Sequence, residues 1–154
     1  MDWLIRPALS ADFAAVEELL RVSALPLDGV GAHFNTFIVA EARAHLLGSA
    51  GLEIYESSAL LRSVVVHESA RGSGVGSSLT LCALEHALDR GIVDVYLLTT
   101  TAVAFFSKHG FERVDRAQIP PSIAASVEFT TACPASATAM RWRVAAVGGS
   151  EPRS

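Results

Sequence analysis

Features that this sequence lacks exclude several classes of protein. Its 154 residues contain only two cysteines, Cys82 and Cys133, which are too few for a disulfide framework. No stretch reaches the roughly 18 consecutive apolar residues that a membrane-spanning helix needs. The first residues carry an acid, Asp2, and lack the apolar core of a signal peptide, so we expect a cytoplasmic protein.

Charge is scarce as well, and positive charge is the scarcer sign. Charged residues make up 18% of the chain, and the formal net charge is −4 with no basic run. Because nucleic acids and anionic membranes attract basic patches, the composition argues against both as partners. The five histidines show neither HxH nor HExxH spacing, so no metal site is predicted.

What is present suffices for one domain. Hydrophobic residues make up 51% of the chain, and 154 residues can bury a core without disulfides or metals. We expect a single domain over residues 1–146, followed by a disordered tail over 147–154, where glycine and polar residues dominate.

The most informative stretch runs from Leu60 to Arg90. It contains the apolar, β-branched run Val64–Val66, the glycine-rich loop RGSGVG at 71–76, and then an amphipathic helix pattern. Glycines let the backbone approach a bound group closely, because they have no Cβ. The first turn of a helix offers unpaired N–H groups at its positive dipole end. The stretch therefore predicts a cradle for a pyrophosphate over 71–77.

The spacing within the loop narrows the choice of ligand. A Walker loop ends in Gly-Lys-Ser/Thr, which is missing here. A dinucleotide fingerprint reads GxGxxG with an acidic residue at the end of a strand about twenty positions later, whereas this loop reads GSGVG and has no such acidic residue. Arg71, Gly74 and Gly76 instead fill the pattern Arg/Gln-x-x-Gly-x-Gly/Ala. This loop resembles the coenzyme A loop of the GCN5-related N-acetyltransferase (GNAT) superfamily.

Two further blocks narrow the resemblance. The run LLTTTAVAFFSKHGFE looks like a block of amino-acid N-acetyltransferases such as N-acetylglutamate synthase. The segments GLE…LLRSVVV and EFTTACPASA resemble the small arsenic-resistance acetyltransferase-like proteins more closely still.

The order of elements agrees with this resemblance over residues 4–144. Periodicity and turn residues predict strands at 4–6, 36–41, 46–55, 59–67, 93–98 and 138–144, with a further strand starting near Phe111. Helices are predicted after Ser10, after the glycine loop, around Phe105 and after Pro121. The resemblance implies the α/β (α+β) GNAT fold: a mixed, mostly antiparallel, twisted sheet of about six to seven strands, flanked by about four helices and splayed between strands four and five.

The resemblance also implies a reaction. Acetyl would pass from acetyl-CoA to the primary amine of a small, amino-acid-like acceptor, glutamate-like or organoarsenical, by direct attack, in a monomer or homodimer. The alternative is a catalytically silent CoA-binding or acyl-CoA-sensing module. It is kept open because Phe106 and Leu60 occupy positions where relatives carry a tyrosine acid and a glutamate base.

Glu53 and Arg62 are the candidates for acceptor chemistry. Antiparallel pairing across the turn at 56–58 brings them close in register, so Glu53 is the candidate general base, directly or through one water. Strand alternation places Arg62 on one face with Leu60 and Val64, and Ser63 on the other. The resemblance implies that the face of Leu60, Arg62 and Val64 is the one toward the acceptor, so Arg62 could clamp an acceptor carboxylate. The plain alternatives are a solvated glutamate and a solvent-facing arginine.

Thr99, at the end of a strand, is the candidate to protonate the leaving thiolate, although it could equally cap the next helix. Ser107 is a weaker substitute. A covalent mechanism through either cysteine is disfavoured, since no His/Asp constellation accompanies them. The expected cofactor-binding residues are Val64, Val65, Val66, Arg71, Gly72, Ser73, Gly74, Val75, Gly76, Ser77, Thr100, Phe105, Phe106 and Lys108, and the expected acceptor-binding residues are Arg62, Ser63 and Thr99.

Overall fold

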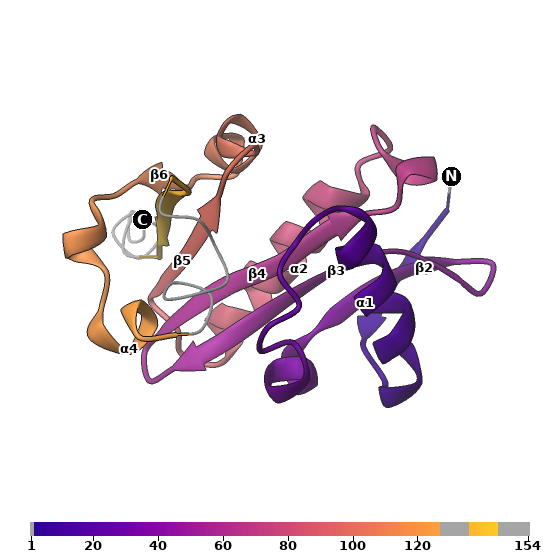
Figure 1. Ribbon diagram of the computed structural model, residues 1–154, viewed down its shortest axis with the longest axis horizontal. Coiled ribbons are helices and arrows are strands. Elements are labelled where there is room, and N and C mark those ends of the chain that lie inside the picture. The colour runs from indigo at the N-terminus through magenta and orange to yellow at the C-terminus, as the bar shows by residue number, and fades with distance from the viewer. Residues whose placement is uncertain (1, 127–135, 145–154) are drawn as a thin grey trace, which may run out of the picture.

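Seven strands form one twisted sheet in the order β1-β2-β3-β4-β5-β7-β6, as the computed structural model shows (Figure 1). The structure describes residues 2–126 and 136–144. The strands are β1 (Leu4–Pro7), β2 (Ile38–Ala42), β3 (His45–Tyr55), β4 (Ser58–Val66), β5 (Asp94–Thr99), β6 (Glu112–Arg113) and β7 (Thr138–Arg143). The α-helices are α1 (Phe13–Val22), α2 (Val75–Asp89), α3 (Val103–Lys108) and α4 (Pro121–Ala124), and short 3₁₀ helices include η2 (Gly31–Thr36) and η3 (Glu68–Ala70).

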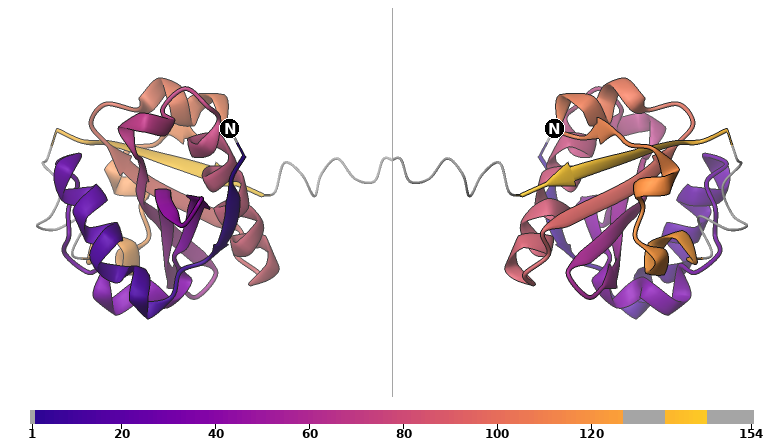
Figure 2. Two further views of the ribbon diagram at one scale, coloured as in Figure 1. Left: turned by 90° about the vertical axis from the view of Figure 1, so that its right-hand side faces the viewer. Right: turned by 90° about the vertical axis from the view of Figure 1, so that its left-hand side faces the viewer.

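Helices cover both faces of the sheet (Figure 2). The α2 side chains at every fourth position, Val75, Leu79, Ala83 and Ala87, are buried in the largest core cluster. On the opposite face α1 buries Val16 and Leu20 in a second cluster. The short α4 packs Ile123 in a third cluster. This architecture confirms the fold predicted from the sequence.

The sheet is antiparallel except between β4 and β5, which run parallel. These two strands pair only over Ser58–Leu60 and Asp94–Tyr96. Beyond that ladder β4 continues to Val66 and β5 to Thr99 along diverging paths (Figure 1). The predicted splay between strands four and five is confirmed.

A β-bulge in β4 accompanies the splay. Ser63 has a φ of +57°, and the register between β3 and β4 shifts between the pairs Ser49–Val65 and Gly51–Arg62. The Ser49 hydroxyl donates to the Ser63 carbonyl at 2.8 Å, which satisfies a polar group that the irregular backbone leaves out of the ladder.

The bulge corrects the predicted strand alternation. Leu60 packs beside α4, whereas Leu61 packs in the α2 cluster, so the two faces alternate as expected up to Arg62. Past Ser63, Val64 packs against the α2 cluster and Val65 lies in the α1 cluster. Val64 therefore does not share a face with Leu60 and Arg62, because one extra residue reverses every later side chain.

Some predictions fall outside the described residues. Cys133 and the tail at 147–154 belong to this group, so the structure adds nothing to the account of them. Among the described helices, none is long and apolar enough to cross a bilayer.

Candidate active site

A cleft of about 520 Å³ opens where β4 and β5 diverge. Segments far apart in the sequence form its walls, and they include parts of β4 and β5 and the loops next to them. The lining residues are Ser23–Pro26, Leu61–Val66, Arg71, Leu97–Ala102, Phe106 and Ala137. The cleft thus runs from Arg71, the first residue of the glycine loop, to the segment that follows α1.

The glycine loop has the backbone conformation that its sequence predicts. Gly72 and Gly74 have φ of +82° and +97°, in the left-handed region that favours glycine, and Gly74 is the N-cap of α2. The first helical hydrogen bond runs from the Ser78 amide to the Gly74 carbonyl at 3.0 Å. The amides at 75–77 precede this bond, so they stay available for an anion at the positive end of a 15-residue helix.

At Gly76 a glycine is favoured by close packing and not by a left-handed backbone conformation. A Cβ at this position would lie 3.3 Å from Cγ2 of Val66 and 3.5 Å from Cζ of Phe105. The missing side chain lets the first turn of α2 lie close to both β4 and α3. In the same turn, the Ser77 hydroxyl is hydrogen-bonded to Nε2 of His109 at 3.0 Å.

Arg71 lies between the loop and the cleft. Its Nε donates to the Val66 carbonyl at 3.2 Å, and its side chain lines the cleft. This contact directs a positive charge toward the end of the cleft nearest the glycine loop, which suits a phosphate-bearing ligand.

Arg62 and Glu53 form a buried ion pair. Nη1 of Arg62 lies 2.7 Å from Oε2 of Glu53, and their side chains are 0% and 2% exposed. Nε of Arg62 also donates to the Ser63 hydroxyl at 3.1 Å, and Nη2 donates to the Pro26 carbonyl at 3.3 Å. Neither residue is the solvated surface group that the plain alternatives suggested.

Glu53 is held from its other side as well. The Tyr55 hydroxyl donates to Oε1 at 2.5 Å, and Nε2 of His33 lies 3.6 Å from the same oxygen. Glu53 does not line the cleft, whereas Arg62 does. The assignment of Glu53 as general base stays a prediction. Because Glu53 reaches the cleft only through its ion pair with Arg62, a role in positioning Arg62 is the alternative.

Thr99 lies at the end of β5 and lines the cleft. Its Oγ1 accepts a hydrogen bond from the Ala102 amide at 3.0 Å, which closes the turn between β5 and α3, whereas the N-cap of α3 is Ala102 and receives no side-chain cap. A hydroxyl that accepts through a lone pair keeps its own proton to donate. Both roles are therefore compatible.

The structure does not bring Ser107 to the cleft. Phe106 is buried and lines the cleft, whereas Ser107 and Lys108 are exposed. Consecutive residues on a helix point about 100° apart, so the neighbour of an inward phenylalanine points outward. Ser107 is in no position to replace the missing tyrosine hydroxyl, which corrects that prediction.

The other predicted residues divide into two groups. Val64, Val65, Val66, Ser63 and Thr100 line the cleft. The remainder of the predicted cofactor set, Gly72, Ser73, Gly74, Val75, Gly76, Ser77 and Phe105, lies at the glycine loop and its neighbours.

Sequence reasoning missed the bulge at Ser63 and the contacts of Tyr55 and His33 with Glu53. The single serine inside the run LLRSVVV is the one hint of irregularity. The contact of His33 could not be read from the sequence, because it depends on how η2 packs on the sheet, whereas Tyr55 follows Glu53 by two residues on β3 and so shares its face.

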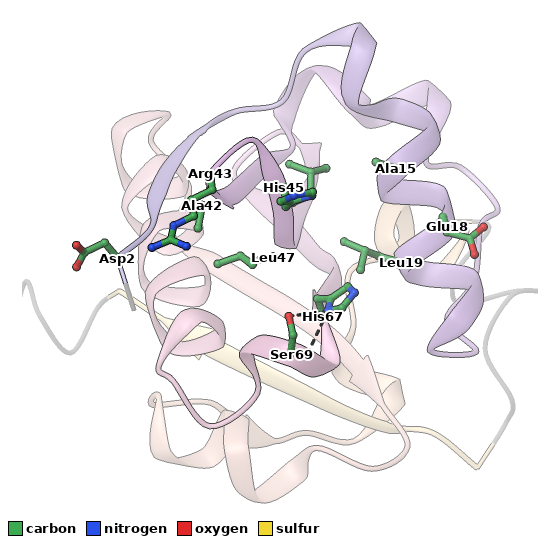
Figure 3. Close-up of a pocket in the computed structure, with 11 residues that line it drawn as sticks. Asp2, Ala15, Glu18, Leu19, Ala42, Arg43, His45, Leu47, His67 and Ser69 are labelled. Carbon is green, nitrogen blue, oxygen red and sulfur yellow. Dashed lines mark hydrogen bonds between the residues drawn. The ribbon is translucent and has the colours of Figure 1, made fainter.

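A second cavity, of about 870 Å³, is larger than the cleft but lies elsewhere (Figure 3). It is lined from α1, the β2–β3 hairpin and the segment after β4, with Leu19, His45 and His67 among its residues. None of the predicted catalytic or binding residues lines it. Size alone does not make it the active site, since Arg71 of the glycine loop, the buried Arg62 and Thr99 all line the cleft.

Cys82 is poorly suited to nucleophilic catalysis. Burial raises the pKa of its thiol, with a smaller contribution from Glu85, so the reactive thiolate is disfavoured. In the part of the chain that the structure describes, no group of three or more His, Cys, Asp or Glu side chains could hold a metal ion.

An acetyltransferase (GNAT) domain profile matches residues 33–113, which includes the splayed strands, the glycine loop and α3. The chain belongs to the GNAT acetyltransferase family. This membership confirms the prediction of an acyl-CoA-dependent N-acyltransferase at the level of the family.

Two curated relatives carry similar sequences. An uncharacterized N-acetyltransferase of Chlorobaculum tepidum is 25% identical over 130 residues, which are 79% of this chain and 83% of the relative. An amino-acid acetyltransferase of Pasteurella multocida is 28% identical over 129 residues, which are 75% of this chain but only 28% of the relative.

Solved structures agree on the fold. The N-acetylglutamate synthase of Neisseria gonorrhoeae, complexed with coenzyme A and N-acetyl-glutamate, has a TM-score of 0.80 at 20% identity, over 93% of this chain and 35% of that one. A Mycobacterium tuberculosis protein, solved with coenzyme A, has a TM-score of 0.79 at 21% identity, over 91% and 98%. This GNAT chain spans about a third of the synthase.

Proposed function

We propose that this GNAT protein transfers acetyl from acetyl-CoA to the primary amine of a small, amino-acid-like acceptor in the β4–β5 cleft. One observation supports this proposal above the others. A single cleft carries Arg71 beside the glycine loop and Arg62 beside the segment after α1. A phosphate-bearing co-substrate and an anionic acceptor could therefore meet between the two strands.

Acetyl-CoA is the co-substrate in this account. Its pyrophosphate lies on the amides at 75–77, with the Arg71 guanidinium close by. The exposed edge of β4 at Val64–Val66 holds the pantetheine arm by backbone hydrogen bonds, since β5 does not pair with this part of β4. Two of the neighbours named above were solved with coenzyme A, which supports the assignment.

The acceptor carries an anionic group in this proposal. Arg62 lines the cleft, and we assign it to the acceptor because a guanidinium recognises carboxylates and similar oxyanions, although its side chain is 0% exposed and bonded to Glu53 here. The relatives named for amino-acid acetylation and for N-acetyl-glutamate support an amino acid. A glutamate-like and an organoarsenical amino acid both fit this description.

The chemistry is a direct transfer. The neutral amine attacks the thioester carbonyl carbon, a C–N bond forms as the C–S bond breaks, and the nitrogen loses one proton to water in the cleft while the departing thiolate takes one up, so that the proton count is unchanged. The Thr99 hydroxyl, at the β5 end of the cleft, is our candidate donor of that proton, directly or through a water.

One observation favours a second candidate, a silent CoA-binding or acyl-CoA-sensing module. Phe106 is buried and lines the cleft at the position where the resemblance expects a tyrosine, and a phenyl ring donates no proton. The two candidates differ in turnover. Incubation with acetyl-CoA and the standard amino acids, with free thiol followed by absorbance and product by mass spectrometry, separates them.

A further inference from the structure

The segment after α1 forms one wall of the cleft, and we call residues 23–30 the acceptor loop. Its first residues, Ser23–Pro26, line the cleft. The loop is anchored at both ends, because the Leu25 amide donates to the Leu20 carbonyl at 2.9 Å and Val30 is fully buried in the α1 cluster. Between these anchors, the loop contacts the buried pair of Arg62 and Glu53.

Two contacts join the acceptor loop to that pair. Nη2 of Arg62 donates to the Pro26 carbonyl at 3.3 Å. At Gly29, with a φ of +82°, a Cβ would lie only 2.8 Å from Nη1 of Arg62 and 3.6 Å from Oε2 of Glu53. The loop backbone thus lies directly on the ion pair, and only glycine fits both the conformation and the space.

The direction of the Arg62 side chain depends on Glu53. The carboxylate on β3 fixes Nη1, and Tyr55 fixes the carboxylate through its other oxygen. Loss of this carboxylate removes an ion-pair partner from a buried guanidinium, which loosens its direction and weakens its hold on the Pro26 carbonyl. Glu53 cannot affect the cleft directly, because it does not line it.

We propose that Glu53 is a positioning residue. Acting through Arg62, it docks the acceptor loop against β4 and so sets the shape of the acceptor end of the cleft. The expected effect on the acceptor KM rests on the proposed function, whereas the docking of the loop through Arg62 does not. Glu53 takes no proton from the amine in this account.

Two variants disturb the contact between the acceptor loop and Arg62, one from the sheet and one from the loop. Glu53→Gln removes the charge that orients Arg62 and keeps the size of the side chain. Gly29→Ala leaves both charges in place and forces the loop away from Nη1. Glu56→Gln, at an exposed carboxylate in the β3–β4 turn, is the matched control.

Kinetics should show a specific pattern. With the standard amino acid that the wild type acetylates fastest, Glu53→Gln and Gly29→Ala raise the acceptor KM about tenfold or more, while the affinity for acetyl-CoA changes less than about twofold. The double variant is no worse than the poorer single one, since both loosen one contact. The acidic limb of the pH–rate profile stays in place.

Hydrogen exchange provides a readout that does not need turnover. Amides of the acceptor loop exchange about tenfold faster or more in both variants, and those of β3 and β5 do not. Unchanged loop exchange, or a lower kcat with a shifted acidic limb and an unchanged acceptor KM, would overturn the proposal. If Glu53→Gln does not fold, Gly29→Ala decides alone. A wild type without turnover would refute the proposed function, whereas the exchange result would still decide the docking.

Discussion

The Arg62 guanidinium on β4 and the Glu53 carboxylate on β3 are 2.7 Å apart and shielded from solvent. The sequence indicated both residues but assigned them to separate tasks, a clamp and a base. Their pairing means that neither acts alone. A change at Glu53 reaches the acceptor only through Arg62, and a change at Arg62 leaves a buried carboxylate without its main partner.

Gly74→Val should weaken the binding of acetyl-CoA by about tenfold or more. Gly74 has a φ of +97° at the N-cap of α2, and a β-branched residue there would change the path of the amides that we assign to the pyrophosphate. Calorimetric titration with coenzyme A measures the effect. Gly91→Val is the control, because Gly91 also has a positive φ but lies at the other end of α2. Equal losses of affinity in both variants would refute the cradle.

Thr99→Val should lower kcat by about tenfold, whereas Thr99→Ser should retain most of it. Valine preserves the shape and removes the hydroxyl, which accepts from the Ala102 amide in the turn before α3 and, in our account, donates the proton. Loss of this hydrogen bond alone should cost about 1 kcal/mol of unfolding free energy. Steady-state kinetics and urea unfolding separate the effects. A stability loss without a change in kcat would leave Thr99 only its structural role in the turn before α3.

The pH dependence of stability should show the contribution of Asp12. Two hydrogen bonds from Arg6 lower the pKa of Asp12 below its ordinary value, and the Leu9 amide adds a third. A carboxylate with a depressed pKa stabilises the fold above its unfolded pKa of about 3.9, and this stabilisation is lost as the pH falls through the folded pKa.

Asp12→Asn should therefore lower the unfolding free energy by about 1 kcal/mol at pH 7, and the difference from the wild type should shrink as the pH falls below about 4. Urea unfolding across this range measures it. Glu112→Gln, at an exposed carboxylate on β6, is the control. A constant difference at all pH values would exclude the ion pair with Arg6 as its source.

Cys82 should react slowly with thiol reagents and should be dispensable. Burial raises the pKa of the Cys82 thiol, so the rate of labelling should rise at a higher pH than it does for a free cysteine. In a Cys133→Ser background, labelling with a chromogenic disulfide gives this rate. Cys82→Ala should keep turnover close to the wild type, whereas a covalent mechanism through Cys82 would require it to be lost.

The sequence predicts most of the fold because its local signals agree with one another. Gly72 and Gly74 indicate the loop, alternating apolar residues indicate the strands, and the helices follow from their periodicity. The predicted boundaries differ from the observed ones by a few residues, as at β2, which begins at Ile38.

The site was less predictable because its key contacts are tertiary. The bulge at Ser63 carries no glycine signal, and it reverses the facing of the residues after it. The environment of Glu53 includes Arg62 on β4 and His33 on η2, which are distant from it in sequence. Ser107 was misplaced because its nearness to Phe106 in sequence says nothing of direction on a helix.

Thiol release from acetyl-CoA in the presence of the standard amino acids and organoarsenical amino acids tests the central claim most directly. Our account predicts one equivalent of free coenzyme A per acetylated amine for at least one anionic acceptor, with Gly74→Val weakened through the acetyl-CoA KM and Arg62→Lys through the acceptor KM. Tight binding of coenzyme A without thiol release for any amine would contradict it and would favour the silent binding module.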